Sequence, residues 1–240
     1  MQPEQRLAAL GFGAEDAAIL ASHFRWAEEK GETGHGYSRI DWLESWDEVP
    51  LEAPRRVADD RWDGEGALGY LTLHAAVQAQ LASPPDRARV VVCSQTFPTG
   101  ALGYWVRMLA EGGLVGLLTA TSPRRLASPD GGPPLAGTNP LAIGIPSSDG
   151  EPVVADVSMG AVTHGAVLAG LAQPEELVPF GGPQAYKAFA LAVGLQLFVD
   201  SLVGDGFGAV LVVARPGADP VPALRELAAG VRLPGSPARS

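Results

Sequence analysis

The stretch from Tyr186 to Val203 constrains the fold more than any other part of the sequence. Its apolar side chains fall on nearly every face of a helix, and a helix that is apolar all round is normally buried. We therefore predict a central buried helix, which begins after Gly181-Gly182-Pro183. Lys187 lies in its first turn, where a cation opposes the helix dipole. Its position predicts a nearby anion such as a cofactor phosphate.

The sequence contains both strand-like and helix-like segments. Runs rich in β-branched residues predict strands over 89–94, 141–145 and 209–214. Helical spacing of apolar residues predicts helices over 3–10, 14–30 and 70–81, and shorter helices elsewhere.

Composition narrows the choice of partners and compartment. The chain has 17 basic and 27 acidic residues, a formal charge of −10, and no cluster of Lys or Arg. This argues against nucleic acid and against an anionic membrane surface as partners. The apolar run 188–199 is shorter than the roughly 20 residues that span a bilayer, and the N-terminus lacks a signal-peptide pattern. We expect a soluble cytoplasmic protein.

Disulfide and metal chemistry are not expected. Cys93 is the one cysteine and falls in an apolar strand, so it forms no intrachain disulfide. The histidines, His23, His35, His74 and His164, show no metal-ligand spacing. His164 is expected to be an exposed helical residue.

The loop from Gly31 to Arg39 is the strongest candidate for chemistry. His35 lies between two glycines, so the backbone can bend and a ligand can approach the imidazole. Imidazole changes charge near neutral pH and can give a proton. Arg39 follows four residues later and offers a planar fork that matches a carboxylate. A proton donor beside a carboxylate clamp is suited to reducing a 2-oxo acid or a cyclic imine acid.

Three downstream segments can complete such a site. Gly100, Ala101 and Leu102 form a turn between a strand and a helix, where backbone N–H groups can face a phosphate. Thr138 lies in a rigid corner before a proline and is suited to contacting a substrate. Asp156 ends a strand beside Ser158, at a loop where sites are common.

Four motifs resemble the type-2 malate/L-lactate dehydrogenase family, which includes ureidoglycolate and sulfolactate dehydrogenases and the reductases of piperideine-2-carboxylate and pyrroline-2-carboxylate. The most specific match is Gly137-Thr138-Asn139-Pro140-Leu141-Ala142-Ile143-Gly144-Ile145-Pro146. The others are Gly34-His35-Gly36-Tyr37-Ser38-Arg39, Gly100-Ala101-Leu102-Gly103-Tyr104, and Gly181-Gly182 followed by Tyr186-Lys187.

The resemblance implies a non-Rossmann α/β fold with a mixed, largely antiparallel sheet, NAD or NADP as cofactor, and a homodimer. It implies that His35 is the proton donor and that Arg39 and Thr138 bind a small carboxylate substrate. It places Gly100, Ala101, Leu102, Asp156, Val157, Ser158 and Lys187 at the cofactor. The chain would comprise an N-terminal helical segment with the His/Arg loop (1–60), a cofactor-binding α/β core (61–180), and a buried helix, strand and helix returning to that core (181–240).

Several family positions are substituted. Gly34 replaces the serine before the histidine, and Pro98 falls where the family has a second histidine. Ala166 falls at a relay or lysine position, and Ala188 and Ala190 replace glycines of the lysine loop. Two hypotheses follow. The chain is an NAD(P)H-dependent reductase of a 2-oxo acid or cyclic imine carboxylate, or it is a divergent homologue without redox activity that acts as a non-redox biosynthetic enzyme or partner subunit.

Overall fold

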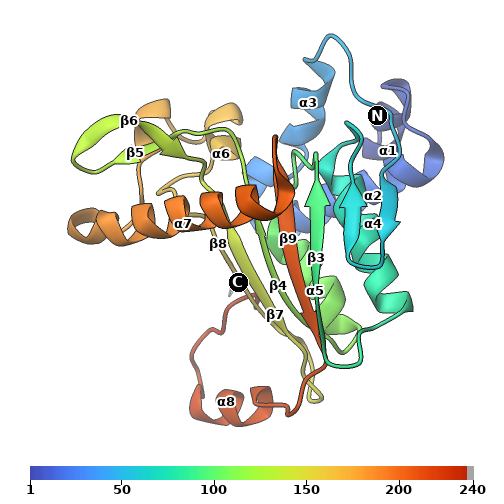
Figure 1. The fold of residues 1–240 in the computed structure, drawn as a ribbon, viewed down its shortest axis with the longest axis vertical. Helices are drawn as coiled ribbons and strands as arrows, with labels where there is room; N and C mark the ends of the chain where they lie inside the picture. The colour runs from blue at the N-terminus through green and yellow to red at the C-terminus, as the bar shows by residue number, and fades with distance from the viewer. Residues whose placement is uncertain (237–240) are drawn as a thin grey trace.

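The fold is built on a seven-stranded mixed sheet with the order β1-β2-β3-β9-β4-β7-β8 (Figure 1). The computed structural model describes residues 1–236. Neighbouring strands run antiparallel, except that β2 and β3 are parallel. The strands are β1 (Arg55–Ala58), β2 (Arg61–Asp63), β3 (Ala88–Ser94), β4 (Val115–Ala120), β7 (Leu141–Ile145), β8 (Val153–Val157) and β9 (Gly208–Ala214), and a separate hairpin is formed by β5 (Leu126–Ser128) and β6 (Gly131–Ala136).

Helices cover both faces of this sheet. Helices α4 and α5 lie behind it in Figure 1, and α7 crosses its front. The helices are α1 (Pro3–Ala9), α2 (Ala14–Glu29), α3 (Ser38–Glu44), α4 (Gly69–Ala82), α5 (Leu102–Glu111), α6 (His164–Leu168), α7 (Ala185–Val203) and α8 (Val221–Leu227), with short 3-10 turns at Thr33–His35, Pro174–Glu176 and Gly182–Gln184.

The main core lies between the sheet and the α4–α5 layer. Val91 of β3, Leu118 of β4 and Leu211 of β9 are fully buried, as is Trp105 of α5. The predicted mixed α/β fold with a largely antiparallel sheet is confirmed. The three sequence segments all contribute to one sheet, because β1 comes from the first, β9 from the last and the other strands from the middle.

Helix α7 differs from its prediction. Only one stripe of it is buried, formed by Ala185, Ala188, Ala192, Gln196 and Val199. Large apolar side chains on the opposite face are exposed, namely Tyr186, Leu191, Leu197, Phe198 and Leu202. The prediction of a helix buried on every side is therefore wrong. Small alanines let the helix approach the sheet closely, and nothing in residues 1–236 covers the other side.

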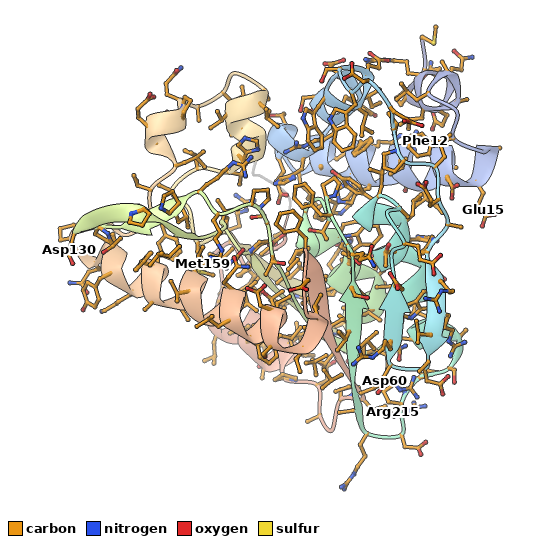
Figure 2. The ribbon with its side chains drawn as sticks, turned by 45° about the horizontal axis from the view of Figure 1, so that its top comes forward. Phe12, Glu15, Asp60, Asp130, Met159 and Arg215 are labelled. Carbon is orange, nitrogen blue, oxygen red and sulfur yellow. The ribbon has the colours of Figure 1, made fainter. Side chains whose placement is uncertain are left out.

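Two further contacts fix α7 in place. Asn139 Nδ2 donates hydrogen bonds to the carbonyl of Ala192 (3.0 Å) and to Gln196 Oε1 (3.0 Å). Met159 fills a small second core between α7 and the β5–β6 hairpin (Figure 2).

With the preceding turn, the helical segment 182–203 is long and apolar enough to cross a membrane by length and composition alone. The expectation that this region is too short to do so is corrected.

Candidate active site

A cavity of about 400 Å³ lies where the Thr33–His35 turn, the start of α5, the corner before β7 and helix α6 meet. It brings together most of the residues that the sequence singled out. Those that line it are His35, Arg39, Gly100, Ala101, Leu102, Thr138, Asp156 and Ser158.

Val157 and Lys187 lie elsewhere. Val157 is exposed and lines a neighbouring cavity of about 280 Å³, which also contains Lys30, Arg107 and Arg232. Lys187 is exposed on α7, with its ammonium nitrogen 5.8 Å from the centre of the Tyr186 ring. Neither of these two residues is part of the lining that residues 1–236 give the 400 Å³ cavity.

Arg39 is a buried cation without a counter-ion. It lies in α3 with 7% of its surface exposed, and its guanidinium carbon is 5.0 Å from the centre of the Trp42 ring. A Cβ at Gly165 would overlap its Nη2 atom, so α6 packs tightly against the guanidinium. Its Nε is buried without a hydrogen-bond partner, and no carboxylate of residues 1–236 forms an ion pair with it. A ligand carboxylate would supply the missing charge and hydrogen bonds.

His35 lies next to this guanidinium and is neutral in the free protein. Burial, followed by the charge of Arg39 and then His23, lowers the pKa of His35 to about 3. Its Nδ1 is buried and has no hydrogen-bond partner in residues 1–236. The imidazole therefore has a buried polar atom without a partner, and its residue lines the same cavity as the unpaired Arg39.

Gly34 permits the close approach of α6 to this loop. A Cβ at Gly34 would lie 2.7 Å from the backbone nitrogen of Ala166, closer than real Cβ atoms come. A serine here, as in the family motif, would require α6 to move. The substitution at Gly34 and the position of Ala166 are thus parts of one packing arrangement.

The start of α5 lines the cavity, but its backbone donors are already used. Ala101 N–H donates to His23 Nε2 (3.1 Å), and Gly103 N–H donates to Asp156 Oδ2 (2.6 Å). The Asp156 carboxylate also accepts a hydrogen bond from the Leu102 backbone. Of the three amides expected to face a phosphate, those of Ala101 and Leu102 are therefore engaged within the protein.

The two carboxylates of the cavity gather at the end near α5. Burial raises the pKa of Asp156 to about 6, although the two backbone donors oppose the shift. Burial and then the charge of Asp156 raise the pKa of Glu32 to about 7. Arg39 is not among the causes of either shift.

The structure adds three residues that the sequence analysis did not place at the site. The Tyr70 hydroxyl is buried without a hydrogen-bond partner in residues 1–236, and the Arg39 charge opposes the rise that burial causes in the pKa of Tyr70. Arg125 lines the cavity from the segment after β4. His164 also lines it, so it is not the isolated surface residue that was expected. Each lies on a different element, and no local motif marked them.

Comparison with known proteins places this chain in a family. The family model for malate/L-lactate dehydrogenase matches residues 3–177. The chain is 28% identical over 233 residues to a Δ1-pyrroline-2-carboxylate/Δ1-piperideine-2-carboxylate reductase of Pseudomonas syringae pv. tomato, covering 82% of this chain and 66% of that protein. It is 29% identical over 170 residues to a malate dehydrogenase of Pyrococcus horikoshii, covering 66% of this chain and 46% of the relative. The chain thus spans two thirds of the length of the first relative and under half of the second.

Solved structures agree. The Δ1-piperideine-2-carboxylate reductase from Pseudomonas syringae superposes with a TM-score of 0.79 at 25% identity, covering 98% of this chain and 88% of that chain. A malate dehydrogenase from Entamoeba histolytica has the same fold, with a TM-score of 0.79 at 20% identity over 98% of this chain and 84% of its own. Because the family model covers most of the sequence and the fold matches over nearly its whole length, this chain belongs to the malate/L-lactate dehydrogenase family.

Proposed function

We propose that this protein is an NAD(P)H-dependent reductase of a small 2-oxo acid or cyclic imine carboxylate. One observation carries the proposal: the guanidinium of Arg39 is buried in a cavity beside His35 and has no counter-ion in residues 1–236. Buried charges in proteins are normally paired. An unpaired one in a cavity is best explained by an anionic ligand.

Arg39 binds the substrate carboxylate through its planar fork, which donates two parallel N–H hydrogen bonds to the two carboxylate oxygens. The ring of Trp42 on one side and Gly165 on the other hold the guanidinium in place. Thr138 lines the same cavity and contacts the substrate from the corner before β7. These contacts fix the orientation of the reacting carbon.

His35 supplies the proton to the oxygen or nitrogen that is reduced. In the free protein, burial and then the positive charge of Arg39 lower its pKa to about 3. A substrate carboxylate on Arg39 offsets that charge, so the pKa of His35 rises when substrate binds. Protonation of the donor is thereby linked to occupation of the carboxylate site.

A nicotinamide cofactor supplies the hydride when bound. The unsatisfied polar atoms of His35, Arg39 and Tyr70 point to a polar ligand in the cavity. A volume of about 400 Å³ suits a substrate with a nicotinamide ring but not a whole dinucleotide. The second cavity shares Glu32 and Asp156 with the first and contains Lys30 and Arg232, which are suited to holding phosphates, whereas its Arg107 is paired with Glu111 and Glu151.

The alternative is a divergent homologue without redox activity. Two observations favour it: the amides of Ala101 and Gly103 are already bonded to His23 and Asp156, and Lys187 lies away from both cavities among the described residues. In that case the cavity still binds a carboxylate, and the protein serves as a non-redox enzyme or a partner subunit.

We also propose that the protein is a cytoplasmic homodimer. A second copy would cover the exposed apolar face of α7, which includes Leu191, Leu197 and Phe198. Light scattering after gel filtration tests this. A monomer at micromolar concentration, or recovery in the membrane fraction, would contradict it.

The experiment for the main proposal is a screen of 2-oxo acids and cyclic imino acids with NADH and NADPH, followed by cofactor absorbance. We expect turnover with at least one substrate, and we expect Arg39→Met to abolish most of it. No turnover, combined with carboxylate binding that Arg39→Met removes, would favour the alternative.

A further inference from the structure

Gln196 is a buried polar residue in the otherwise apolar packed stripe of α7. It shares this stripe with Ala192 and Val199, and 5% of its surface is exposed. A buried amide destabilises a protein unless its hydrogen bonds are satisfied. Both polar atoms of Gln196 are hydrogen-bonded, and their partners show what the residue does in the fold.

The Oε1 atom of Gln196 holds the residues on both sides of Thr138. It accepts one hydrogen bond from the backbone N–H of Gly137 (3.1 Å) and another from Nδ2 of Asn139 (3.0 Å). Asn139 has a φ of 25°, which residues other than glycine seldom adopt. The shared oxygen therefore fixes the backbone before and after Thr138 at a strained corner.

Thr138 is held at the wall of the 400 Å³ cavity by contacts from two sides. On one side, its carbonyl accepts a hydrogen bond from Met159 N–H (2.8 Å), and a Cβ at Gly160 would lie 3.1 Å from its Cγ2 methyl group. On the other side, Gln196 holds its two neighbours. Gln196 is not part of the lining that residues 1–236 give the cavity, so it acts on a ligand through Thr138.

The other end of the Gln196 amide is anchored on its own helix. Nε2 donates to Oδ1 (3.0 Å) and Oδ2 (3.2 Å) of Asp200, one turn further along α7. Asp200 Oδ2 lies 3.8 Å from Nη2 of Arg124, whose side chain is 58% exposed. A flipped amide would present a donor to Gly137 N–H and an acceptor to the Asp200 carboxylate. The two ends of the side chain therefore fix its orientation.

We propose that Gln196 is a positioning residue, which sets the place of Thr138 against a carboxylate ligand in the cavity. The inference rests on the proposed function for the contact between Thr138 and the substrate. A misplacement of about 1 Å that arises away from the reacting atoms can cost on the order of 10²-fold in rate. Helix α7 thereby contributes to the site without touching the ligand.

The test is calorimetric titration with oxalate in the absence of cofactor. Gln196→Met removes the shared acceptor, and we expect it to raise the Kd for oxalate roughly tenfold, as for the loss of one hydrogen bond to a charged group. Gln80→Met is the matched control, because Gln80 is a fully buried glutamine of α4 whose Oε1 accepts a hydrogen bond from Arg89 (2.7 Å). Urea unfolding should show a loss of stability in both variants, but Gln80→Met should change the Kd by less than about twofold.

A milder variant and a rescue test the same contact. Asp200→Ala frees Nε2 and leaves the apolar packing of α7 intact, since Asp200 is half-buried. It should raise the Kd for oxalate about threefold. Gln196→Glu combined with Asp200→Asn keeps an acceptor towards Gly137 and Asn139 and a donor one turn later, so it should restore the Kd to within about twofold of the wild-type value.

A double-mutant cycle tests whether the effect passes through Thr138. Thr138→Val removes the hydroxyl with little change in shape, and in this background Gln196→Met should raise the Kd by less than about twofold further. An additive tenfold loss in that background would overturn the positioning role. An unchanged Kd in Gln196→Met or Asp200→Ala, an equal loss in Gln80→Met, or a failed rescue would also overturn it.

Binding without cofactor separates this inference from the proposed reaction. The expected Kd values in a protein that reduces none of the 2-oxo or cyclic imino acids would refute the proposed function and leave the role of Gln196 standing. An active protein whose oxalate Kd is the same in Gln196→Met would refute the positioning role alone. Absence of oxalate binding by the wild-type protein would refute both.

Discussion

Replacing Arg39 by methionine should separate ligand binding from stability. Two charge-assisted hydrogen bonds to a carboxylate contribute about 1.5–3 kcal/mol each, so their loss costs about 3–6 kcal/mol of transition-state stabilisation. At about 1.4 kcal/mol for each factor of ten, kcat/KM should fall by roughly 10²- to 10⁴-fold.

The same change should not destabilise the free protein. An unpaired buried charge carries a desolvation penalty of several kcal/mol, and methionine removes it while still packing against Trp42 and Gly165. The lost cation–π contact with Trp42 contributes about 1–2 kcal/mol in the opposite direction. We therefore expect the free energy of unfolding to stay the same or to rise by up to about 2 kcal/mol.

Urea unfolding without ligand and initial rates of cofactor oxidation measure the two effects. Arg124→Met controls for the loss of an arginine at an exposed site, where a change below about 0.5 kcal/mol is expected. A loss of stability above about 1 kcal/mol with unchanged kcat/KM would show that Arg39 has a structural role. That result would refute the carboxylate-binding argument.

Three further predictions concern groups around the same cavity. Tyr70→Phe removes a buried hydroxyl without a partner in residues 1–236, so the free energy of unfolding should be unchanged or higher. Because the hydroxyl is expected to bond the substrate, kcat/KM should fall about tenfold. Urea unfolding measures the first effect and initial rates measure the second. The pKa of Glu32 is about 7 in the folded protein against an ordinary 4.5. The free energy of unfolding should therefore fall by on the order of 2–3 kcal/mol as the pH rises from 4.5 to 7. Glu32→Gln should remove this pH dependence, which urea unfolding at several pH values measures. Oxalate binding should be accompanied by more proton uptake at pH 5 than at pH 8. Burial and then the charge of Arg39 lower the pKa of His35 to about 3, and the bound anion offsets the second of these causes. Identical binding heats at pH 5 in buffers of different ionisation enthalpy would contradict the coupling.

Central strands of the sheet were predictable because short apolar runs mark them, whereas β1, β2, β5 and β6 were not predicted. The β-branched runs at 89–94, 141–145 and 209–214 form β3, β7 and β9 nearly as expected. Their order was not predictable, since β9 enters between β3 and β4 from the far end of the chain. Strand pairing over such separations depends on tertiary packing, which local sequence does not specify.

The burial predicted for α7 from the spacing of its apolar residues was wrong for a physical reason. Apolar residues around a helix show that it could be buried on all sides, but not which side has a partner within the chain. The close contact is made by the small residues Ala188 and Ala192, while Leu197 and Phe198 remain exposed. A stripe of alanines at helical spacing was the signal that could have identified the packed face.

The candidate site was predictable where residues are adjacent in sequence, and not where the fold brings them together. His35 and Arg39 share one loop and helix, and both line the cavity. Tyr70, Arg125 and His164 come from α4, the segment after β4, and α6, so no spacing links them. An arginine in a polar loop is ordinary in sequence, and it is the fold that brings Arg125 to the cavity.

Cofactor binding tests the central claim most directly. The purified protein is titrated with NADH and with NADPH while nicotinamide fluorescence is followed. We expect a saturable increase in nicotinamide fluorescence with at least one of them. A further change in fluorescence is expected when oxalate, which is not reduced, is added as a second ligand. No fluorescence change with either nucleotide at millimolar concentration, with or without oxalate, would contradict the account of the cavity as a reductase site.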